Sequence, residues 1–303
     1  MKRWRSGSSI LLFVLWLSCV ANAAPAPALT FKFRSYDVPG ATQTWLTGIN
    51  NAGVIVGWFA DAQFNFHGFT LTNGKLKQID DPNGDQTQIW GINSSGDLVG
   101  SYHDPCIEEL CYEGFIYRNG KFTNIGPPFF KTPPEDDSPQ SVAYGINDSG
   151  VIAGLGGDGF GGELGFQFKN RKYRPLKVPG ANGELAVGIN NAGLVTLNSA
   201  TNTTFDAYLY NGSTYKKINV PHGGENFAGG INNLGDVVLG FGSAEGNHIH
   251  GALLHANTYY KFVYSKGKHE TFPFGINDKR TIVGVWTRNG THDINVHGLI
   301  VRY

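Results

Sequence analysis

The sequence predicts an all-β fold: a six-bladed β-propeller of four-stranded blades, closed by the N-terminal strand pairing with the last blade. Three observations predict it, namely a repeated unit, a composition that disfavours helices, and chain ends that complement each other. Of the 303 residues, 42 are glycine and only 16% are charged. Glycine is a weak helix former, and a hydrophobic fraction of 41% argues against disorder. We therefore expect strands joined by tight turns.

The repeated unit is marked by the tripeptide Gly-Ile-Asn, which occurs six times. The copies begin at residues 48, 91, 145, 188, 230 and 275, so successive copies are 43, 54, 43, 42 and 45 residues apart. Most copies continue with a turn that contains Asn, Asp or Ser and Gly, and then with an apolar run. Units of this length, built from short strands and turns, are typical of propeller blades.

The first unit illustrates the four strands that we expect in each blade. The first strand ends in Gly-Ile-Asn, and the turn at 51–53 leads to a second strand that starts at 54–56. The third strand runs through 68–71, and Asn73-Gly74 then provides a hairpin turn to the fourth. Fourth strands end near a proline, as at 178–180, and a proline without an N–H belongs at a sheet edge. The fourth strand should therefore be the outermost strand of each blade.

The two ends of the chain predict how the ring closes. The last unit stops after its third strand, at residues 297–303, and has no fourth strand. Residues 33–40 resemble the fourth-strand segments at 173–180 and 215–223. The N-terminal segment should therefore complete the last blade and leave no blade edge unpaired.

The first thirty residues predict export. Lys2, Arg3 and Arg5 precede an apolar run over 10–20 and the small-residue sequence 21–23, which is the pattern of a secretory signal peptide. We expect a signal peptide over 1–23 cleaved near Ala23, an Ala/Pro linker over 24–30, and a single propeller domain over 31–303. The mature protein would be secreted, periplasmic or extracellular. A lipoprotein attached at Cys19 is the alternative, and the apolar run is short for a membrane span.

Two cysteines remain after such a cleavage, Cys106 and Cys111. In an oxidising compartment, a close pair predicts a disulfide that closes a small surface loop. The alternative is a two-thiolate metal site, which would need two further ligands at suitable spacing. Removing residues 1–23 leaves 21 basic against 24 acidic residues, so we expect no nucleic-acid partner. No phosphate- or dinucleotide-binding motif stands in a supporting context, and we predict no metal and no cofactor.

The third strands carry a triplet that points to a family. It reads His67-Gly68-Phe69 in the first unit, and the equivalent triplets are His250-Gly251-Ala252 and His297-Gly298-Leu299. With these residues the repeat resembles that of the extracellular HAF-repeat family, named for a His-Ala-Phe triplet that has glycine here in place of alanine. The resemblance covers nearly all of the mature chain. It implies a secreted repeat protein, and it implies no common activity and no catalytic residue.

Residues that recur in every unit build the blades, so a functional site is expected where the units differ. The long connections join second to third strands and fourth to first strands, and they share one face, which we call the loop face; the short turns share the other, the turn face. Aromatic residues near the loop face predict a ligand-binding site: Trp45, Trp58, Trp90, Tyr102, Tyr144 and Trp286. Aromatic faces stack on sugar rings. The alternative is that these rings fill the centre of the ring and the gaps between blades.

Histidines and acids near the same face provide candidate catalytic residues: His248, His269, His292 and Asp293. His67, His250 and His297 belong to the repeat, and we expect them to hold loops by hydrogen bonds. Three functions stay open. The first is a module that binds carbohydrate or another extracellular polymer; the second is a polysaccharide lyase or glycoside hydrolase; the third is a structural scaffold for protein interactions. The expected partner is an extracellular polysaccharide or protein, bound by a monomer.

Overall fold

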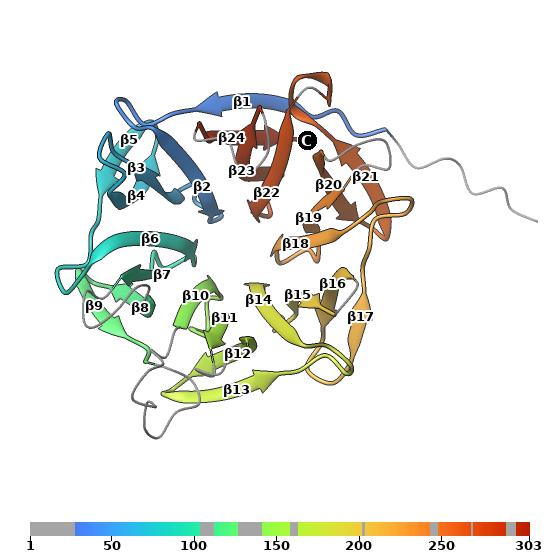
Figure 1. The fold of residues 1–303 in the computed structure, drawn as a ribbon, viewed down its shortest axis with the longest axis horizontal. Helices are drawn as coiled ribbons and strands as arrows, with labels where there is room; N and C mark the ends of the chain where they lie inside the picture. The colour runs from blue at the N-terminus through green and yellow to red at the C-terminus, as the bar shows by residue number, and fades with distance from the viewer. Residues whose placement is uncertain are drawn as a thin grey trace, which may run out of the picture.

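A computed structural model describes residues 28–103, 112–126, 141–157, 163–201, 204–242, 248–267, 269–288 and 295–303. These residues form six four-stranded antiparallel sheets, which Figure 1 shows as blades arranged in a ring. The predicted six-bladed β-propeller is thereby confirmed. In these ranges no helix is long and apolar enough to cross a membrane.

Blades 1 to 3 each use four consecutive strands. Blade 1 contains β2 (Gln43–Ile49), β3 (Ile55–Ala60), β4 (Phe66–Thr72) and β5 (Lys75–Gln78). Blade 2 contains β6 (Asp85–Ile92), β7 (Leu98–His103), β8 (Tyr112–Arg118) and β9 (Lys121–Asn124). Blade 3 contains β10 (Ser141–Ile146), β11 (Ile152–Gly157), β12 (Glu163–Lys169) and β13 (Lys172–Leu176).

Blades 4 and 5 repeat this order, and blade 6 differs in its outermost strand. Blade 4 contains β14 (Gly183–Ile189), β15 (Val195–Ala200), β16 (Phe205–Tyr210) and β17 (Tyr215–Lys217). Blade 5 contains β18 (Asn226–Ile231), β19 (Val237–Gly242), β20 (Ile249–His255) and β21 (Thr258–Phe262), followed by the 3-10 helix η1 (Tyr264–Gly267). Blade 6 contains β22 (Glu270–Ile276), β23 (Thr281–Thr287), β24 (His297–Arg302) and β1 (Lys32–Tyr36).

Strand β1 closes the ring as the chain ends predict. It pairs with β24 in antiparallel register, from Lys32 opposite Arg302 to Tyr36 opposite Gly298. Figure 1 shows β1 on the outer side of blade 6, beside blade 1. Two segments more than 250 residues apart in sequence thus form one sheet, and the sequence prediction of this closure is confirmed.

The glycine of each Gly-Ile-Asn lies where neighbouring innermost strands come closest. A Cβ on Gly275 would lie 2.9 Å from the Cα of Gly48 and 3.0 Å from the carbonyl oxygen of Thr47. A Cβ on Gly188 would likewise lie 3.0 Å from the Cα of Gly230. Only glycine permits this backbone approach. The innermost strands therefore meet at a ring of glycines, one from each blade.

The asparagine of the tripeptide links each blade to the next. Its side-chain nitrogen donates to the backbone carbonyl of the equivalent asparagine in the following blade: Asn50 to Asn93, Asn93 to Asn147, Asn147 to Asn190, Asn190 to Asn232, Asn232 to Asn277, and Asn277 to Asn50. In each blade the side-chain oxygen accepts backbone N–H groups of its own turn, as Asn50 does from Ala52 and Val54. The result is a closed and buried ring of hydrogen bonds, which we call the asparagine ring.

The hydrophobic core lies between the blades. One cluster joins Val56 of blade 1 to Ile89, Leu98 and Phe115 of blade 2. Both faces of a blade pack against neighbours, so both faces carry apolar or small residues. This packing explains the low charge of the composition.

Several predictions fall on residues outside the described ranges. They are the signal peptide at 1–23, most of the linker at 24–30, and the disulfide between Cys106 and Cys111. They stay predictions.

Candidate functional site

A largely apolar cavity lies where the six innermost strands approach the loop face. Its volume is about 280 Å³, and its lining comes from β2, β6, β10, β14, β18 and β22 with contributions from blades 4 and 5: Thr47, Trp90, Tyr144, Leu185, Val187, Asn198, Phe205, Phe227, Ala228, Gly229, Gly240, Phe272, Pro273 and Phe274. Figure 1 shows those six strands nearest to the centre of the ring. We call this cavity the central pocket.

Its position follows from the repeat. The residue directly before each Gly-Ile-Asn glycine lines the pocket in all six blades, and the residue two positions earlier lines it in blades 4, 5 and 6. Because these positions are free to vary between blades, they carry Trp90 and Tyr144 in blades 2 and 3 but only Gly229 in blade 5. The pocket is therefore built from residues in which the units differ.

Four of the six predicted ligand-binding residues come together beside the central pocket. Trp45 stacks on Trp58 with ring centroids 4.8 Å apart and planes inclined by 12°. Trp90 lies edge-on to Trp58 at 6.3 Å and 5.2 Å from Tyr144. Phe274 lies 5.8 Å from Trp45 and 6.4 Å from Trp90. We call these five residues the aromatic cluster.

The polar groups of the cluster differ in how they are satisfied. The indole nitrogen of Trp45 donates to Gln43 Oε1 at 3.2 Å. The indole nitrogens of Trp58 and Trp90 are both buried, and no acceptor among the described residues reaches them. Leaving a buried donor without an acceptor costs about 1–3 kcal/mol. The aromatic cluster beside the cavity therefore holds two buried donors without an acceptor among the described residues.

The other polar groups of the pocket already have partners. Asn198 donates to the carbonyl oxygen of Ala228 at 3.1 Å and accepts from its N–H at 2.6 Å. The Thr47 hydroxyl donates to the carbonyl oxygen of Ile89 at 2.7 Å. These groups hold neighbouring blades together. Among the described residues that line the pocket, Trp90 has a side-chain donor without an acceptor.

Tyr102 does not form part of this site, which corrects the sequence prediction. Its side chain is only 2% exposed and packs in the core between blades 1 and 2. The hydroxyl donates to Glu113 and accepts from Asn124 at 2.8 Å. Burial raises the pKa of the Tyr102 phenol well above its ordinary value. Its ring is enclosed by protein, so it has no face to offer a ligand.

Trp286 is also buried, at 8% exposure, and requires the same correction. It packs in the core between blades 5 and 6, stacked on His297 at 4.2 Å. Its indole nitrogen donates to Ser35 Oγ of β1 at 2.9 Å. Trp286 thus helps to attach the closing strand. For both residues the alternative of gap filling between blades is the correct one, because a blade buries both of its faces. The same correction applies to Trp58, which is 5% exposed and does not line the central pocket.

The two candidate catalytic histidines in the described residues, His248 and His269, lie in different surroundings. His269 is partly buried beside Trp286 and Tyr264, and no described residue accepts or donates at its Nδ1 atom. His248 is half-exposed, with Nδ1 4.0 Å from Oε1 of the buried Glu270. His292 and Asp293 lie outside the described residues. The catalytic hypothesis stays a prediction, and Glu270 is a neighbour of His248 that sequence reasoning missed.

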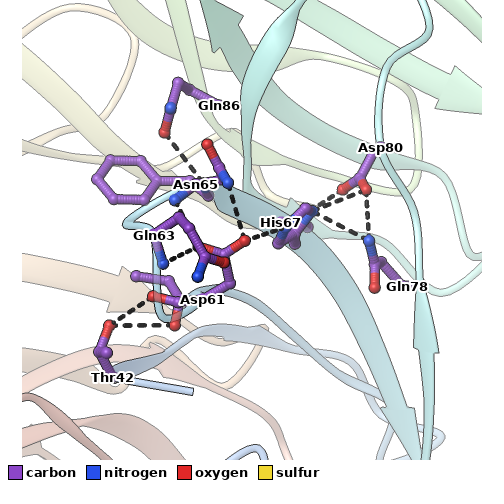
Figure 2. Close-up of polar contacts among 11 residues, drawn as sticks. Thr42, Asp61, Gln63, Asn65, His67, Gln78, Asp80 and Gln86 are labelled. Atoms are coloured by element: carbon purple, nitrogen blue, oxygen red, sulfur yellow. Dashed lines mark hydrogen bonds and ion pairs between the residues drawn. The ribbon is translucent and has the colours of Figure 1, made fainter. Parts of the chain in front are cut away.

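The repeat histidine of blade 1 holds a loop in place, as Figure 2 shows. His67 Nδ1 lies 3.0 Å from Asp80 Oδ2, and His67 Nε2 lies 3.6 Å from Asp61 Oδ2. Asp61 in turn accepts the backbone N–H groups of Gln63 and Asn65, which fixes the β3–β4 loop. The side-chain amide of Asn65 also donates to Asp61 Oδ2 at 2.9 Å, and this bond, followed by the backbone hydrogen bonds, lowers the pKa of Asp61. His67 therefore connects a loop to the end of β5.

The other repeat histidines follow this pattern in part. His297 Nδ1 lies 3.1 Å from both carboxylate oxygens of Asp37, next to β1. His250 has no carboxylate partner among the described residues, and burial lowers its pKa. Among the described residues, no three His, Cys, Asp or Glu side chains lie close enough to hold a metal ion. The sequence expectation that these histidines hold loops agrees with the contacts of His67.

Comparisons with known proteins establish the fold and no more. No family model matches the chain, and no curated protein sequence matches it. Among solved structures, a putative gluconolactonase is 13% identical with a TM-score of 0.54, over 90% of this chain and 92% of that one. TolB from Acinetobacter baumannii is 11% identical with a TM-score of 0.53, over 83% of this chain and 64% of that one. AofleA from Arthrobotrys oligospora is 11% identical with a TM-score of 0.50, over 90% of this chain and 92% of that one.

Proposed function

We propose that this protein is an exported binding module whose central pocket takes one sugar ring, either free or at the end of a longer glycan. The observation that carries the proposal is the aromatic lining of the central pocket, which includes Trp90, whose buried indole N–H has no acceptor among the described residues. The apolar face of a sugar ring packs on aromatic side chains, and a sugar hydroxyl is the acceptor that an indole N–H lacks. A single sugar ring thus provides both an apolar face for the aromatic lining and a hydroxyl acceptor for the indole N–H.

The size of the pocket limits the ligand. A volume of about 280 Å³ is at the small end of ligand sites, which range over roughly 300–1,000 Å³. A long polymer lying across the pocket would leave most of its units outside. We therefore favour recognition of a single unit or a chain end over recognition of an extended chain.

Trp90→Phe is the variant that tests this assignment. It keeps a ring in the aromatic cluster and removes the N–H donor, so we expect affinity for the recognised sugar to fall about tenfold, the loss of a typical hydrogen bond to a buried donor. Intrinsic tryptophan fluorescence, titrated with a panel of mono- and oligosaccharides, measures both the recognition and the loss.

Trp286→Phe is the matched control, because Trp286 is a buried tryptophan outside the pocket. It should lower thermal stability by removing the hydrogen bond to Ser35, and it should leave sugar affinity within about twofold of the wild type. Equal affinity in Trp90→Phe and wild type would overturn the role of Trp90. An unchanged fluorescence signal across the whole panel would overturn carbohydrate binding itself.

Export rests on residues 1–23 and is part of the same proposal. Expression with the native N-terminus in a bacterial host, followed by mass spectrometry of the protein, should give a chain that begins after Ala23. A full-length cytoplasmic product would contradict it.

A further inference from the structure

A second cavity lies at the seam where the ring closes, on the turn face. Its volume is about 630 Å³, and it runs between blade 6 and blade 1. The lining comes from β1 and β24 on one side and from β2, β3 and their turns on the other: Lys32, Phe33, Arg34, Tyr36, Ile49, Ala52, Gly53, Ile55, Leu71, Asn73, Gly74, Asn277, Lys279, Thr281, Ile300 and Arg302. We call it the seam groove.

The charged residues of the seam groove are all positive. They are Lys32, Arg34, Lys279 and Arg302, and no Asp or Glu of the described part of the chain lines the groove. All four side chains are exposed, and none forms a salt bridge with another described residue. The chain after residue 23 has more acidic than basic residues, so this concentration of positive charge is a local feature and does not reflect the composition.

The register places three of these charges on one face of the sheet. Lys32 of β1 is directly opposite Arg302 of β24, and Arg34 lies two residues further along β1, on the same side of the strand. Like charges directly opposite each other destabilise a sheet. An anion bound between them would remove this repulsion.

The rest of the lining suits a hydroxylated ligand. Ile49, Ile55 and Leu71 provide an apolar floor from blade 1. Asn73 and Thr281 present an amide and a hydroxyl, and no described residue forms a hydrogen bond with either side-chain group. The groove therefore combines cations, an apolar surface and neutral hydrogen-bonding groups.

We propose that the seam groove binds an acidic polysaccharide, a chain of sugar rings that carry carboxylates. The carboxylates would lie against Arg34, Arg302 and the two lysines, and the apolar faces of the rings would lie on the aliphatic floor. Ring hydroxyls would pair with Asn73 and Thr281. An acidic peptide offers the charges without the hydroxyls, so it matches fewer of these groups. The proposal does not depend on the central pocket, which lies toward the opposite face.

The test is binding of polygalacturonate to the purified protein, followed by biolayer interferometry. We expect binding at about 0.02 M salt that weakens steeply at about 0.5 M, because salt screens exposed charges. The double variant Arg34→Ala/Arg302→Ala should lose affinity by about tenfold or more. The second double variant, Lys32→Ala/Lys279→Ala, should also lose affinity for polygalacturonate. With two independent variants, the test does not depend on the correct folding of either one.

Lys169→Ala/Lys172→Ala is the matched control. These exposed lysines are also directly opposite each other, at the β12–β13 turn of blade 3, and they line no part of the groove. The control removes the same charge from the same face, so its affinity should stay within about twofold of wild type. An equal loss in control and groove variants would overturn the site. Tighter binding of polyglutamate than of polygalacturonate would overturn the assignment to a glycan.

Discussion

At the scale of single residues, one buried position repeats in every blade with different residue types. It lies four residues before each Gly-Ile-Asn glycine. In five blades its side-chain oxygen accepts a backbone N–H from the segment that leads into the blade, and in blade 3 it accepts the N–H of Gly114 in β8 of blade 2. The residues are Thr44, Thr87, Ser141, Glu184, Asn226 and Thr271, with acceptor distances of 2.8–3.1 Å. Sequence comparison of the units misses this position, because the chemistry is shared and the residue type is not.

Glu184 is the only carboxyl group among these six residues and is 2% exposed. Burial raises its pKa above the ordinary value of 4.5, although the N–H of Val178 acts in the opposite direction. Between 4.5 and the higher pKa of the folded state, the folded protein binds more protons than the unfolded chain. Stability contributed by Glu184 is therefore greatest at low pH and falls as the pH rises through this interval.

Glu184→Gln tests this linkage. The amide oxygen can still accept from Val178, and the buried charge is removed, so we expect the melting temperature to rise by about 1–3 °C at neutral pH. At about pH 3, more than one pH unit below 4.5, the carboxyl group is protonated in both states, and the two proteins should have the same melting temperature. Differential scanning fluorimetry over this pH range measures the difference. A variant that is less stable than wild type at neutral pH would contradict the account.

Arg280 adopts a turn conformation that its residue type disfavours. It occupies the turn position that is glycine in the other units, which predicts an altered turn. The structure keeps the left-handed conformation there, with φ of 61° for Arg280 and 83° for Gly53. The blade imposes the turn on a residue that disfavours it.

At the scale of elements, the turns between first and second strands are joined by the asparagine ring. Each asparagine both closes its own turn and contacts the next blade. Asn190, for example, donates to the carbonyl oxygen of Asn232 at 3.1 Å and accepts from Leu194 at 3.0 Å. The tripeptide therefore recurs because it serves two elements at once.

Asn190→Ala should destabilise the protein by about 2–3 kcal/mol, because one buried and one part-buried hydrogen bond are lost and the carbonyl of Asn232 stays buried without its donor. Urea unfolding monitored by fluorescence gives the free energy of unfolding. Asn191→Ala is the comparison, since Asn191 is exposed and its hydrogen bonds to Asp148 and Asn233 lie at the surface. We expect a loss of about 1 kcal/mol or less there. Equal losses of unfolding free energy in the two variants would show that the asparagine ring stabilises the protein no more than surface hydrogen bonds do.

At the scale of the whole molecule, the closing strand determines whether the six blades form one cooperative unit. Beyond its register with β24, the N-terminal segment places Phe31 4.9 Å from Phe262 of blade 5. Ser35 accepts the Trp286 hydrogen bond and Tyr36 packs toward blade 1. One segment thus contacts three blades.

A chain that starts at Val38 removes this strand and leaves the outer edge of β24 unpaired. We expect the free energy of unfolding to fall by several kcal/mol and the protein to aggregate, as exposed strand edges do. A synthetic peptide of residues 28–37 added to the truncated protein should restore part of the stability, and a scrambled peptide should not. Unchanged urea unfolding of the truncated chain would contradict the closure as a stabilising element.

The sequence by itself determined the number of blades, the strand order and the closing strand. These follow from local signals: the repeated tripeptide, the turn residues, and the fourth strand that is missing at one end and present at the other. It also brought Trp45, Trp58, Trp90 and Tyr144 forward, in one group with Tyr102 and Trp286. All of them lie in first or second strands, toward the loop face.

Only the tertiary structure decided which of the candidate residues are exposed and which charges lie together. In most sheets, alternation along a strand separates the buried face from the exposed face, but a propeller blade buries both, so Tyr102 and Trp286 carried no sequence sign of their burial. The seam groove depends on pairing between residues 32–36 and 298–302, and no local pattern shows that their charges meet. Contacts between distant segments arise from closing the ring, and closing the ring is a property of the folded molecule.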